Sequence, residues 1–245
     1  MSQPGGRGFA SAFRTGIITG LVFIVVVGAA LGVYVALGHR LPGQGKAESG
    51  RVLIVAGVPD ENGDLVAQVI VDVDTTDTSG PTSLYSVDPT SAVTVVGTSY
   101  GRLRDAYAFG GGARVSETYA RLNGGVTLPY IDLGPAAVAE AVKASGGVTL
   151  ELPSAMNVFD GERLYTFPAG KVLVNAEEFR AVLNGLAYLP ESERVSVLAQ
   201  AAERVTTFVA EYPGGLSDAV DGGLVTTDLG ADDVAAFVTR LTQAR

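Results

Sequence analysis

The chain of 245 residues contains no cysteine and only one histidine. The absence of cysteine excludes disulfide bonds, thiolate catalysis and cysteine-ligated zinc or iron–sulfur centres. The single histidine argues against a histidine-rich metal site and against a Ser-His-Asp triad. His39 also directly follows a long apolar stretch, where a polar residue at a membrane interface is the simpler interpretation.

Charge is lacking from Gly16 to Leu37, a stretch of 22 residues dominated by Ile, Val, Leu and Phe. An α-helix needs about 20 such residues to cross a bilayer core. Ala36–Gly38 resembles a signal-peptide cleavage site, but the apolar run is longer than the usual ~7–15-residue signal core. We therefore expect an uncleaved transmembrane helix at residues 16–37, after a cytoplasmic tail (1–15) and before a linker (38–50). A cleaved signal peptide is the alternative.

The charges are distributed unevenly along the chain, whose net charge is −9. All 26 acidic residues lie beyond Leu37, together with 15 of the 17 basic residues. An acidic domain repels phosphate backbones, so we expect no nucleic-acid partner. The basic residues on the two sides of the apolar stretch do not decide its orientation, because Arg7 and Arg14 precede it and three more follow closely.

Residues 51–245 alternate between strand-like and helix-like patterns, without an internal repeat, which favours one layered domain of mixed α/β structure. Strands are expected at Val52–Val58, Leu65–Val73, Ser83–Val87, Ala92–Val96, Val126–Leu133 and Val148–Leu152. Helices are expected at Ala113–Asn123, Pro135–Ser145, Asn175–Gly185, from Pro190 onward, and at Ala231–Gln243.

Three segments carry sharper local predictions. Asn175 and Glu178 have the spacing of a capping box, with Gly185 as the end of the helix. Asp160–Lys171 has the composition of a hairpin or an irregular loop. The long helix after Pro190 is expected to bury a stripe of residues at helical spacing, namely Val195, Leu198, Ala202, Val205 and Val209.

Two segments share unusual patterns with one family of envelope proteins. They are Arg102-Leu-Arg-Asp-Ala-Tyr-Ala-Phe-Gly-Gly111 and Ala144-Ser-Gly-Gly-Val-Thr-Leu-Glu-Leu-Pro153. They resemble the motifs Lys-Ile-Asn-Ala-Ala-Tyr-Ala-Tyr-Gly-Gly and Ala-Leu-Gly-Gly-Val-x-Val-x-Val-Pro of the LytR-CpsA-Psr family. The resemblance covers residues 51–204 and implies an α/β fold, a layered α-β-α domain with a mixed central sheet. It also implies that residues 51–245 form an extracytoplasmic domain.

The resemblance further implies a chemistry. Members of the family are thought to transfer a glycopolymer from a polyprenyl-pyrophosphate carrier to the cell wall. Such a transfer needs cations to neutralise the pyrophosphate oxygens while the leaving phosphate departs. The family supplies several Arg side chains, whose planar fork suits phosphate, an Asp-bound divalent ion, and an apolar slot for the lipid tail.

The chain departs from the family pattern at the phosphate-binding positions. In the alignment that preserves three successive strands, the Arg-Ser-Asp motif falls on Asn62-Gly-Asp64, without its Arg. The Pro-Arg-Asp motif falls on Ser86–Ser91 or, in a second register that loses the Asp64 match, near Gly97–Tyr100, and neither contains Arg. A later family Arg corresponds to Asn184, whereas Arg194 lies close to the place of the Arg-Gln-Gln motif.

The residues that remain for a site are few. Asp64 is the candidate metal ligand, which would hold Mg²⁺ if any activity is retained, and no cofactor is otherwise indicated. Arg102, Arg104 and Arg194 are the candidate pyrophosphate ligands. For each of them a solvated surface position or a turn is the competing interpretation. The same holds for four other features, namely Asp88, Asp105, the Asp72-Val-Asp74 pair and the Gly110–Gly112 triplet.

The sequence thus predicts a single-pass protein of the cell membrane with an extracytoplasmic, LytR-CpsA-Psr-like domain that has lost its activity. Its expected role is to bind a polyprenyl-linked ligand, a cell-wall glycopolymer or a partner protein during wall assembly. The first alternative is an active phosphotransferase that uses a relocated set of cations. The second is a purely structural envelope domain.

Overall fold

The computed structural model describes residues 50–77 and 82–243. The predicted cytoplasmic tail, the predicted transmembrane helix and all of the predicted linker except Gly50 lie outside these residues. In the described part of the chain, no helix is long and apolar enough to cross a membrane.

A mixed sheet of five strands forms the centre of the domain, in the order β3-β2-β1-β4-β9. β1 pairs in antiparallel fashion with β2 and in parallel fashion with β4, so the predicted mixed central sheet is confirmed. β1 lies in the middle, and its continuous apolar run is buried on both faces. The strands are β1 (Arg51–Pro59), β2 (Leu65–Asp74), β3 (Ser83–Val87), β4 (Tyr130–Leu133) and β9 (Val225–Thr227).

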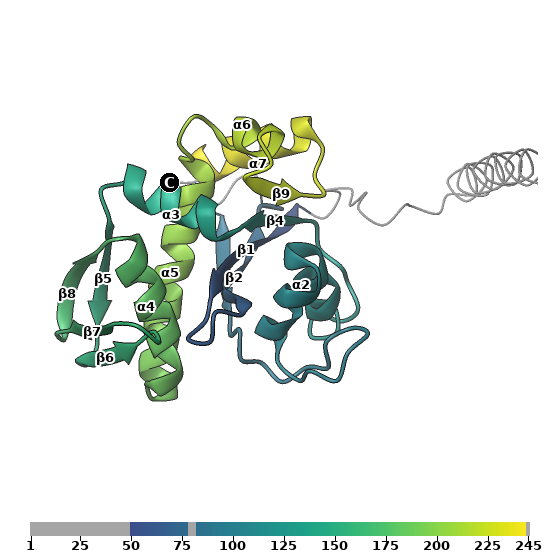
Figure 1. Ribbon diagram of the computed structural model, residues 1–245. Coiled ribbons are helices and arrows are strands. Elements are labelled where there is room, and N and C mark those ends of the chain that lie inside the picture. Colours follow the sequence, from purple (N-terminus) through teal and green to yellow (C-terminus); the bar gives the residue numbers. More distant parts are fainter. Residues whose placement is uncertain (1–49, 78–81, 244–245) are drawn as a thin grey trace, which may run out of the picture. The chain divides into compact units, whose positions relative to one another are not determined.

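Helices cover both faces of this sheet (Figure 1). Leu53 and Val55 of β1 point into one core, under the 3₁₀ helix η2 and helix α2, while Val52 and Ile54 point into a larger core under α3 and α5. The helical elements are η2 (Leu103–Phe109), α2 (Gly111–Tyr119), α3 (Pro135–Ala144), α4 (Ala176–Gly185), η3 (Leu186–Tyr188), α5 (Glu191–Ala210), α6 (Leu216–Asp221) and α7 (Ala231–Gln243).

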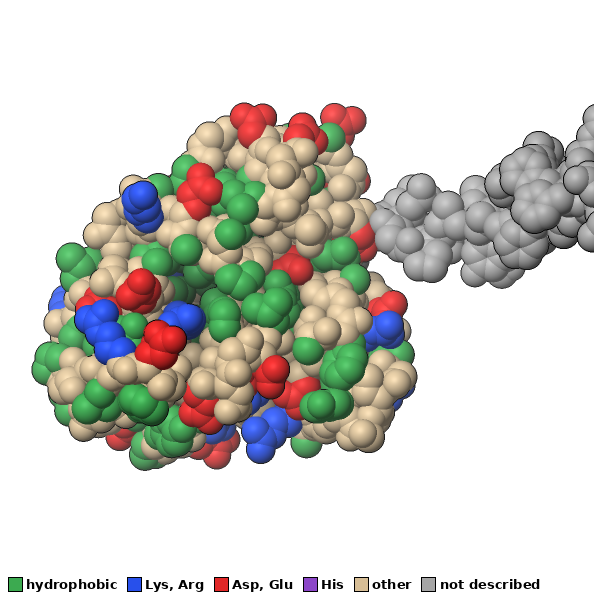
Figure 2. All heavy atoms as spheres, in the orientation of Figure 1, with side chains coloured by type: hydrophobic (Ala, Val, Ile, Leu, Met, Phe, Trp, Pro, Cys, Tyr) green, Lys and Arg blue, Asp and Glu red, His purple; other side chains and the backbone are tan. Residues whose placement is uncertain are grey.

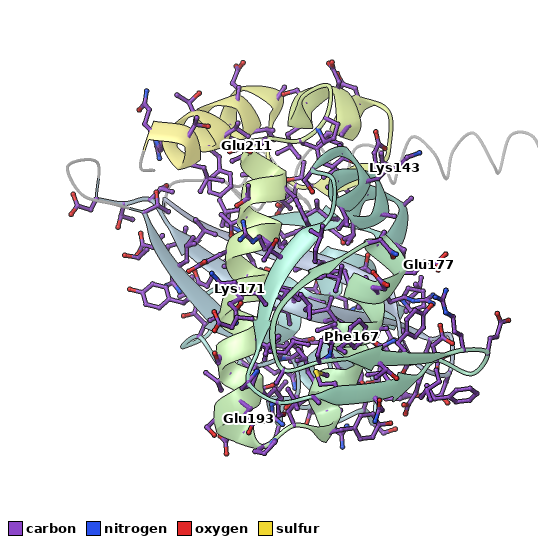
Figure 3. The ribbon with its side chains drawn as sticks, turned by 90° about the vertical axis from the view of Figure 1, so that its left-hand side faces the viewer. Lys143, Phe167, Lys171, Glu177, Glu193 and Glu211 are labelled. Carbon is purple, nitrogen blue, oxygen red and sulfur yellow. The ribbon has the colours of Figure 1, made fainter. Side chains whose placement is uncertain are left out.

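Two small antiparallel sheets form a further layer beyond α5 (Figures 1 and 3). β5 (Val148–Leu152) pairs with β8 (Gly170–Val174), and β6 (Met156–Phe159) pairs with β7 (Leu164–Phe167). β5 packs on α5, and β6 packs on α4. The segment predicted as a hairpin or an irregular loop, Asp160–Lys171, contains the turn and the second strand of the β6–β7 hairpin, whose first strand precedes it.

Several predicted elements agree closely with the structure. β1, β2, β3, β5, α3 and α7 lie where the patterns place them. Asn175 caps α4, because its side chain accepts hydrogen bonds from the backbone N–H groups of Glu177 and Glu178, and the Glu178 carboxylate accepts one from Asn175. The predicted capping box is confirmed.

Other predictions are wrong in extent. Ala92–Val96 is not a strand, because only Ala92 forms a bridge, with Arg102. The predicted strand at 126–133 is reduced to β4, preceded by Pro129, which has no N–H to donate to a ladder. α2 ends at Tyr119 and passes into turns that close with Gly124 and Gly125, both at positive φ. α6 and β9 were not predicted.

The predicted stripe on α5 contains one error. Val195 is 53% exposed, whereas Leu198, Ala202, Val205 and Val209 are buried as expected. The buried face begins instead at Val197. The acidic side chains seen over α6 and α7 in Figure 2 follow from the composition of these helices.

Candidate functional site

Most of the predicted site residues meet at the end of the sheet where the β1–β2 hairpin turns. Contacts link this hairpin to the start of η2, and link the loop after β3 to η2 and to the start of α5. We call the charged residues there the hairpin-end cluster: Asp60, Asp64, Asp88, Arg104, Asp105 and Arg194. Five of the six were singled out from the sequence, and Asp60 was missed.

Arg104 lies at the centre of the cluster. Its Nη2 is 3.9 Å from Asp60 Oδ2, and its Nε is 3.6 Å from Asp105 Oδ1. Its backbone N–H donates a 2.8 Å hydrogen bond to the carbonyl of Pro89, which holds η2 against the loop after β3. Two carboxylates therefore lie within 4 Å of the guanidinium.

Arg194 is held in a similar way from the first turn of α5. Its Nη2 donates a 3.2 Å hydrogen bond to Asp88 Oδ2. The other oxygen of Asp88 accepts hydrogen bonds from the backbone N–H and the hydroxyl of Thr90, at 2.8 and 2.7 Å. Asp88 thus has the turn role that its position before Pro89 suggests, and it also forms an ion pair with Arg194.

The two remaining candidates, Arg102 and Asp64, make fewer side-chain contacts than Arg104 and Arg194. Arg102 is exposed, and its side chain makes no ion pair with a described residue. Asp64 lies in the hairpin turn, where its backbone N–H donates to Asp60 Oδ1 at 3.1 Å. Within residues 50–77 and 82–243, no three His, Cys, Asp or Glu side chains are grouped as ligands for a metal ion.

Asn184 occupies the position where the family resemblance expects an Arg. It is only 8% exposed, and its side-chain oxygen accepts a 2.7 Å hydrogen bond from Gln68, which is 5% exposed. Its side-chain nitrogen donates a 3.2 Å hydrogen bond to the carbonyl of Pro59. The amide is directed into the protein and links α4 to β1 and β2 beside the cluster. Asn62, at the other Arg position, lies in the exposed hairpin turn.

The charge balance of the cluster is therefore negative, with four carboxylates and two guanidinium groups. The Nε atoms of Arg104 and Arg194 are buried and form no hydrogen bond. A pyrophosphate at these guanidinium groups would compete with the carboxylates that already lie beside them. The arrangement stabilises the loops at this end of the sheet, but it does not present a set of free cations.

Asp72 and Asp74, which share the spacing of a metal-binding Asp-x-Asp pair, lie at the opposite end of β2. Asp72 is buried, forms a salt bridge with Arg51, and accepts a 2.9 Å hydrogen bond from the hydroxyl of Tyr119. The hydrogen bond to Asp72 raises the pKa of Arg51, and burial raises the pKa of Tyr119 to about 12. Asp74 accepts hydrogen bonds from Thr76. Both acids therefore have structural partners.

The glycine triplet also has a structural explanation. The N–H of Gly112, in the first turn of α2, donates a 2.8 Å hydrogen bond to Asp132 Oδ2, and the Tyr107 hydroxyl donates to Oδ1 at 2.8 Å. A Cβ on Gly112 would lie 2.7 Å from the Cβ of Asp132, so only glycine permits this approach. Burial raises the pKa of Asp132 despite these donors. The sequence missed this residue, although an acid in a short apolar strand is an unusual feature.

Comparisons with known proteins agree with this architecture. No family model and no curated protein matches the sequence. Among solved structures, the protein gbs0355 from Streptococcus agalactiae is similar over 79% of this chain and 73% of its own, with 13% identity and a TM-score of 0.59. TagT bound to LI-WTA is similar over 83% and 77%, with 15% identity and a TM-score of 0.53.

A third solved structure carries the family name. The LytR-CPS2A-psr family protein YwtF (TagT) with bound octaprenyl pyrophosphate lipid is similar over 83% of this chain and 76% of its own. The identity is 15% and the TM-score is 0.50. The described domain therefore has the LytR-CpsA-Psr fold, as the resemblance of its motifs predicted.

Proposed function

We propose that this protein is a divergent member of the LytR-CpsA-Psr family that binds a polyprenyl-linked envelope ligand or a wall-assembly partner without catalysing transfer. The fold and the motifs at residues 102–111 and 144–153 support the family. The ligand class is supported by YwtF, which has octaprenyl pyrophosphate bound.

The proposal that the protein is not a catalyst rests on the residues at the positions where the family has cations. Asn184 is neutral and has its amide engaged with Gln68 and Pro59, while Arg104 and Arg194 are paired with carboxylates. Removal of one donor to a developing charge commonly reduces a rate by ~10²–10³. Several such losses together leave no effective stabilisation of the charge on the departing polyprenyl phosphate.

Lipid binding does not depend on these cations. Burial of a prenyl chain is driven by the apolar area removed from water, and it needs no charged partner. A protein with this fold can therefore keep its affinity for the tail while it loses the chemistry at the head group.

We further propose that residues 16–37 anchor the protein in the cell membrane with residues 51–245 outside. The length of the uncharged stretch and its apolar composition support a helix of this kind. Mass measurement of the mature N-terminus, together with protease access to intact cells, tests both points. A mature chain that begins at His39 would contradict the anchor.

The active phosphotransferase is the second candidate, because Asp64, Arg104 and Arg194 do lie at one end of the sheet. In this case Arg102 would supply a further cation and Asp64 would hold Mg²⁺. A purely structural envelope domain is the third candidate.

One binding experiment separates the three candidates. The full-length protein in detergent is titrated with octaprenol, octaprenyl phosphate and octaprenyl pyrophosphate, with and without Mg²⁺. The proposal predicts similar affinities for all three lipids, because the tail dominates binding. An enzyme would bind the pyrophosphate more tightly by about tenfold, equivalent to ~1.4 kcal/mol, and would lose this preference in the Arg104→Gln, Arg194→Gln variant. A structural domain would bind none of them.

A further inference from the structure

The two-stranded β5–β8 sheet has one closed edge and one open edge. On the β5 side, the Gln200 side chain of α5 accepts a 2.8 Å hydrogen bond from the backbone N–H of Glu151 and donates a 3.0 Å hydrogen bond to its carbonyl. Gln200 thus replaces a neighbouring strand. On the β8 side, no backbone group of Gly170–Val174 bonds to any described residue other than its partners in β5.

Three cavities adjoin the β5–β8 sheet, and all three are lined by Leu173 of β8. The first, of about 660 Å³, lies between α3 and the start of α4. The second, of about 530 Å³, lies beside the C-terminal part of α5. The third, of about 340 Å³, lies between β7 and β8. Leu173 is 68% exposed, so an apolar side chain is open to solvent where the three cavities meet.

The charges around this edge are complementary to an acidic ligand. Lys143 lines the first cavity, Arg204 lines the second, and Lys171 lies on β8 itself. None of these three side chains forms an ion pair with a described residue, although the chain has a net charge of −9. Figure 3 shows Lys143 and Lys171 on the side of the domain that carries β5 and β8.

The carboxylates that line the same cavities are already engaged. Glu177 pairs with Arg163 at 3.8 Å, and Glu178 accepts the 2.9 Å hydrogen bond of the capping box. Glu211 has a partner of its own. Glu151 lies opposite Lys171 across the β5–β8 pair without forming an ion pair to it. The charge left without a partner around the three cavities is therefore mainly positive.

We propose that β8 is a strand-addition site for an extended, acidic peptide segment of a partner protein. The segment hydrogen-bonds to the open edge of β8, and its side chains alternate between the two faces of the extended sheet. Lys171 and Leu173 are two residues apart and lie on the same face of the sheet. Acidic side chains of the added strand approach Lys171 on that face, and its apolar side chains extend the surface of Val172 and Val174 on the opposite face. This site is separate from the hairpin-end cluster and does not depend on the proposed lipid.

A competing role for Lys171 is protective, since lysine on an edge strand commonly prevents strand pairing. A second copy of this chain is a competing occupant. The same experiment decides between these roles, because strand addition to an acidic peptide makes Lys171 favourable for binding, whereas protection makes it unfavourable.

The test uses the full-length protein in detergent and the fluorescein-labelled probe Glu-Val-Thr-Val-Glu-Val-Thr, blocked at its C-terminus by an amide. Fluorescence polarisation is compared with a probe in which Lys replaces both Glu residues, and with a probe in which Pro replaces the central Val. The acidic probe is expected to bind at least about tenfold more tightly than either control, because the first lacks complementary charge and the second lacks a backbone donor.

Variants of the protein give the second half of the test. Lys171→Glu is expected to reverse the preference between the acidic and the basic probe, and Leu173→Asp to weaken the acidic probe by about tenfold. The matched controls are Arg114→Glu, which lies half-buried on α2 in an ion pair with Glu117, and Leu122→Asp, which is exposed. Both residues lie away from β8, and both substitutions should leave binding unchanged. Circular dichroism melts establish that each variant is folded.

Three results would overturn the proposal. The first is equal binding of the acidic and basic probes, and the second is no binding of the acidic probe up to about 1 mM, a free energy near −4 kcal/mol. The third is a concentration-dependent dimer in sedimentation that Leu173→Asp abolishes, which would assign the edge to a second copy of this chain.

Discussion

The side chain of Gln68 donates a 2.7 Å hydrogen bond to the side-chain oxygen of Asn184, and both residues are buried. Gln68 belongs to β2 and Asn184 to the last turn of α4, so this bond joins two elements that are far apart in the sequence. The second bond of Asn184, to the carbonyl of Pro59, adds the end of β1. A neutral amide that holds the architecture together thus stands where the family resemblance expects a cation.

The first prediction follows from this pair. Asn184→Ala leaves the Gln68 amide buried without its acceptor and the Pro59 carbonyl without its donor, which commonly costs ~1–3 kcal/mol. Urea unfolding of the purified protein measures the loss. Asn62→Ala is the matched control, since Asn62 is exposed and should change stability by less than about 0.5 kcal/mol. Equal effects of the two substitutions would contradict the structural role of Asn184.

Much of this fold could be predicted from local patterns. β1 has a continuous apolar run and β5 has alternating apolar residues, and both patterns match the observed burial. Asn175 and Glu178 have the spacing of a capping box. Each of these signals is contained within a few neighbouring residues. The errors concern segments whose state depends on distant neighbours. β9 is a strand only because β4 provides its partner, and Val195 is exposed although it has the helical spacing of the buried residues of α5.

The position of the candidate site could be predicted from the sequence, but the pairing of its charged side chains could not. The sequence identified Arg104, Arg194 and Asp88 as residues for one site, and the fold brings them together. No local pattern shows that Arg194 pairs with Asp88 or that Asp60 faces Arg104, because these partners are 106 and 44 residues apart. The pairing of charges depends on the tertiary structure, and this pairing decides whether the guanidinium groups are free.

The second prediction concerns Gly57 in the middle of β1. A Cβ at this position would lie 2.0 Å from the ring of Tyr107, which packs directly on the strand. Gly57→Ala should therefore force a displacement of Tyr107 and cost about 3 kcal/mol, at the upper end for overpacking. Gly101→Ala is the control, since its added Cβ would meet no atom within 4 Å. A loss below ~0.5 kcal/mol for Gly57→Ala in chemical denaturation would show that Tyr107 does not pack as described.

The third prediction is a pH dependence from Asp132. Burial raises its pKa above the ordinary value of 3.8, so the folded state binds this proton more tightly than the unfolded state does. The stability that Asp132 contributes is therefore present below this value and is lost as pH rises through the folded pKa. The stability of the wild type minus that of Asp132→Asn should fall as the pH rises above about 4. A difference that rises with pH would reverse the assignment.

The fourth prediction concerns the start of α4. Asn175→Ala removes the acceptor for the backbone N–H groups of Glu177 and Glu178, and it should cost ~1 kcal/mol. Asn157→Ala is the control on β6, where the side chain is exposed. Thermal or urea unfolding of the two variants measures both effects, and an unchanged midpoint for Asn175→Ala would argue against the capping role.

The central claim is that this LytR-CpsA-Psr fold has lost its transfer chemistry. Turnover of a polyprenyl-pyrophosphate-linked substrate, assayed with Mg²⁺ or Mn²⁺ in the presence of the full-length protein, tests it most directly. The Asp64→Ala and Arg102→Ala variants are assayed in parallel. The account predicts that the wild type neither hydrolyses nor transfers the pyrophosphate above the background without protein. Clear turnover by the wild type that either substitution abolishes would contradict it and would establish the protein as an enzyme.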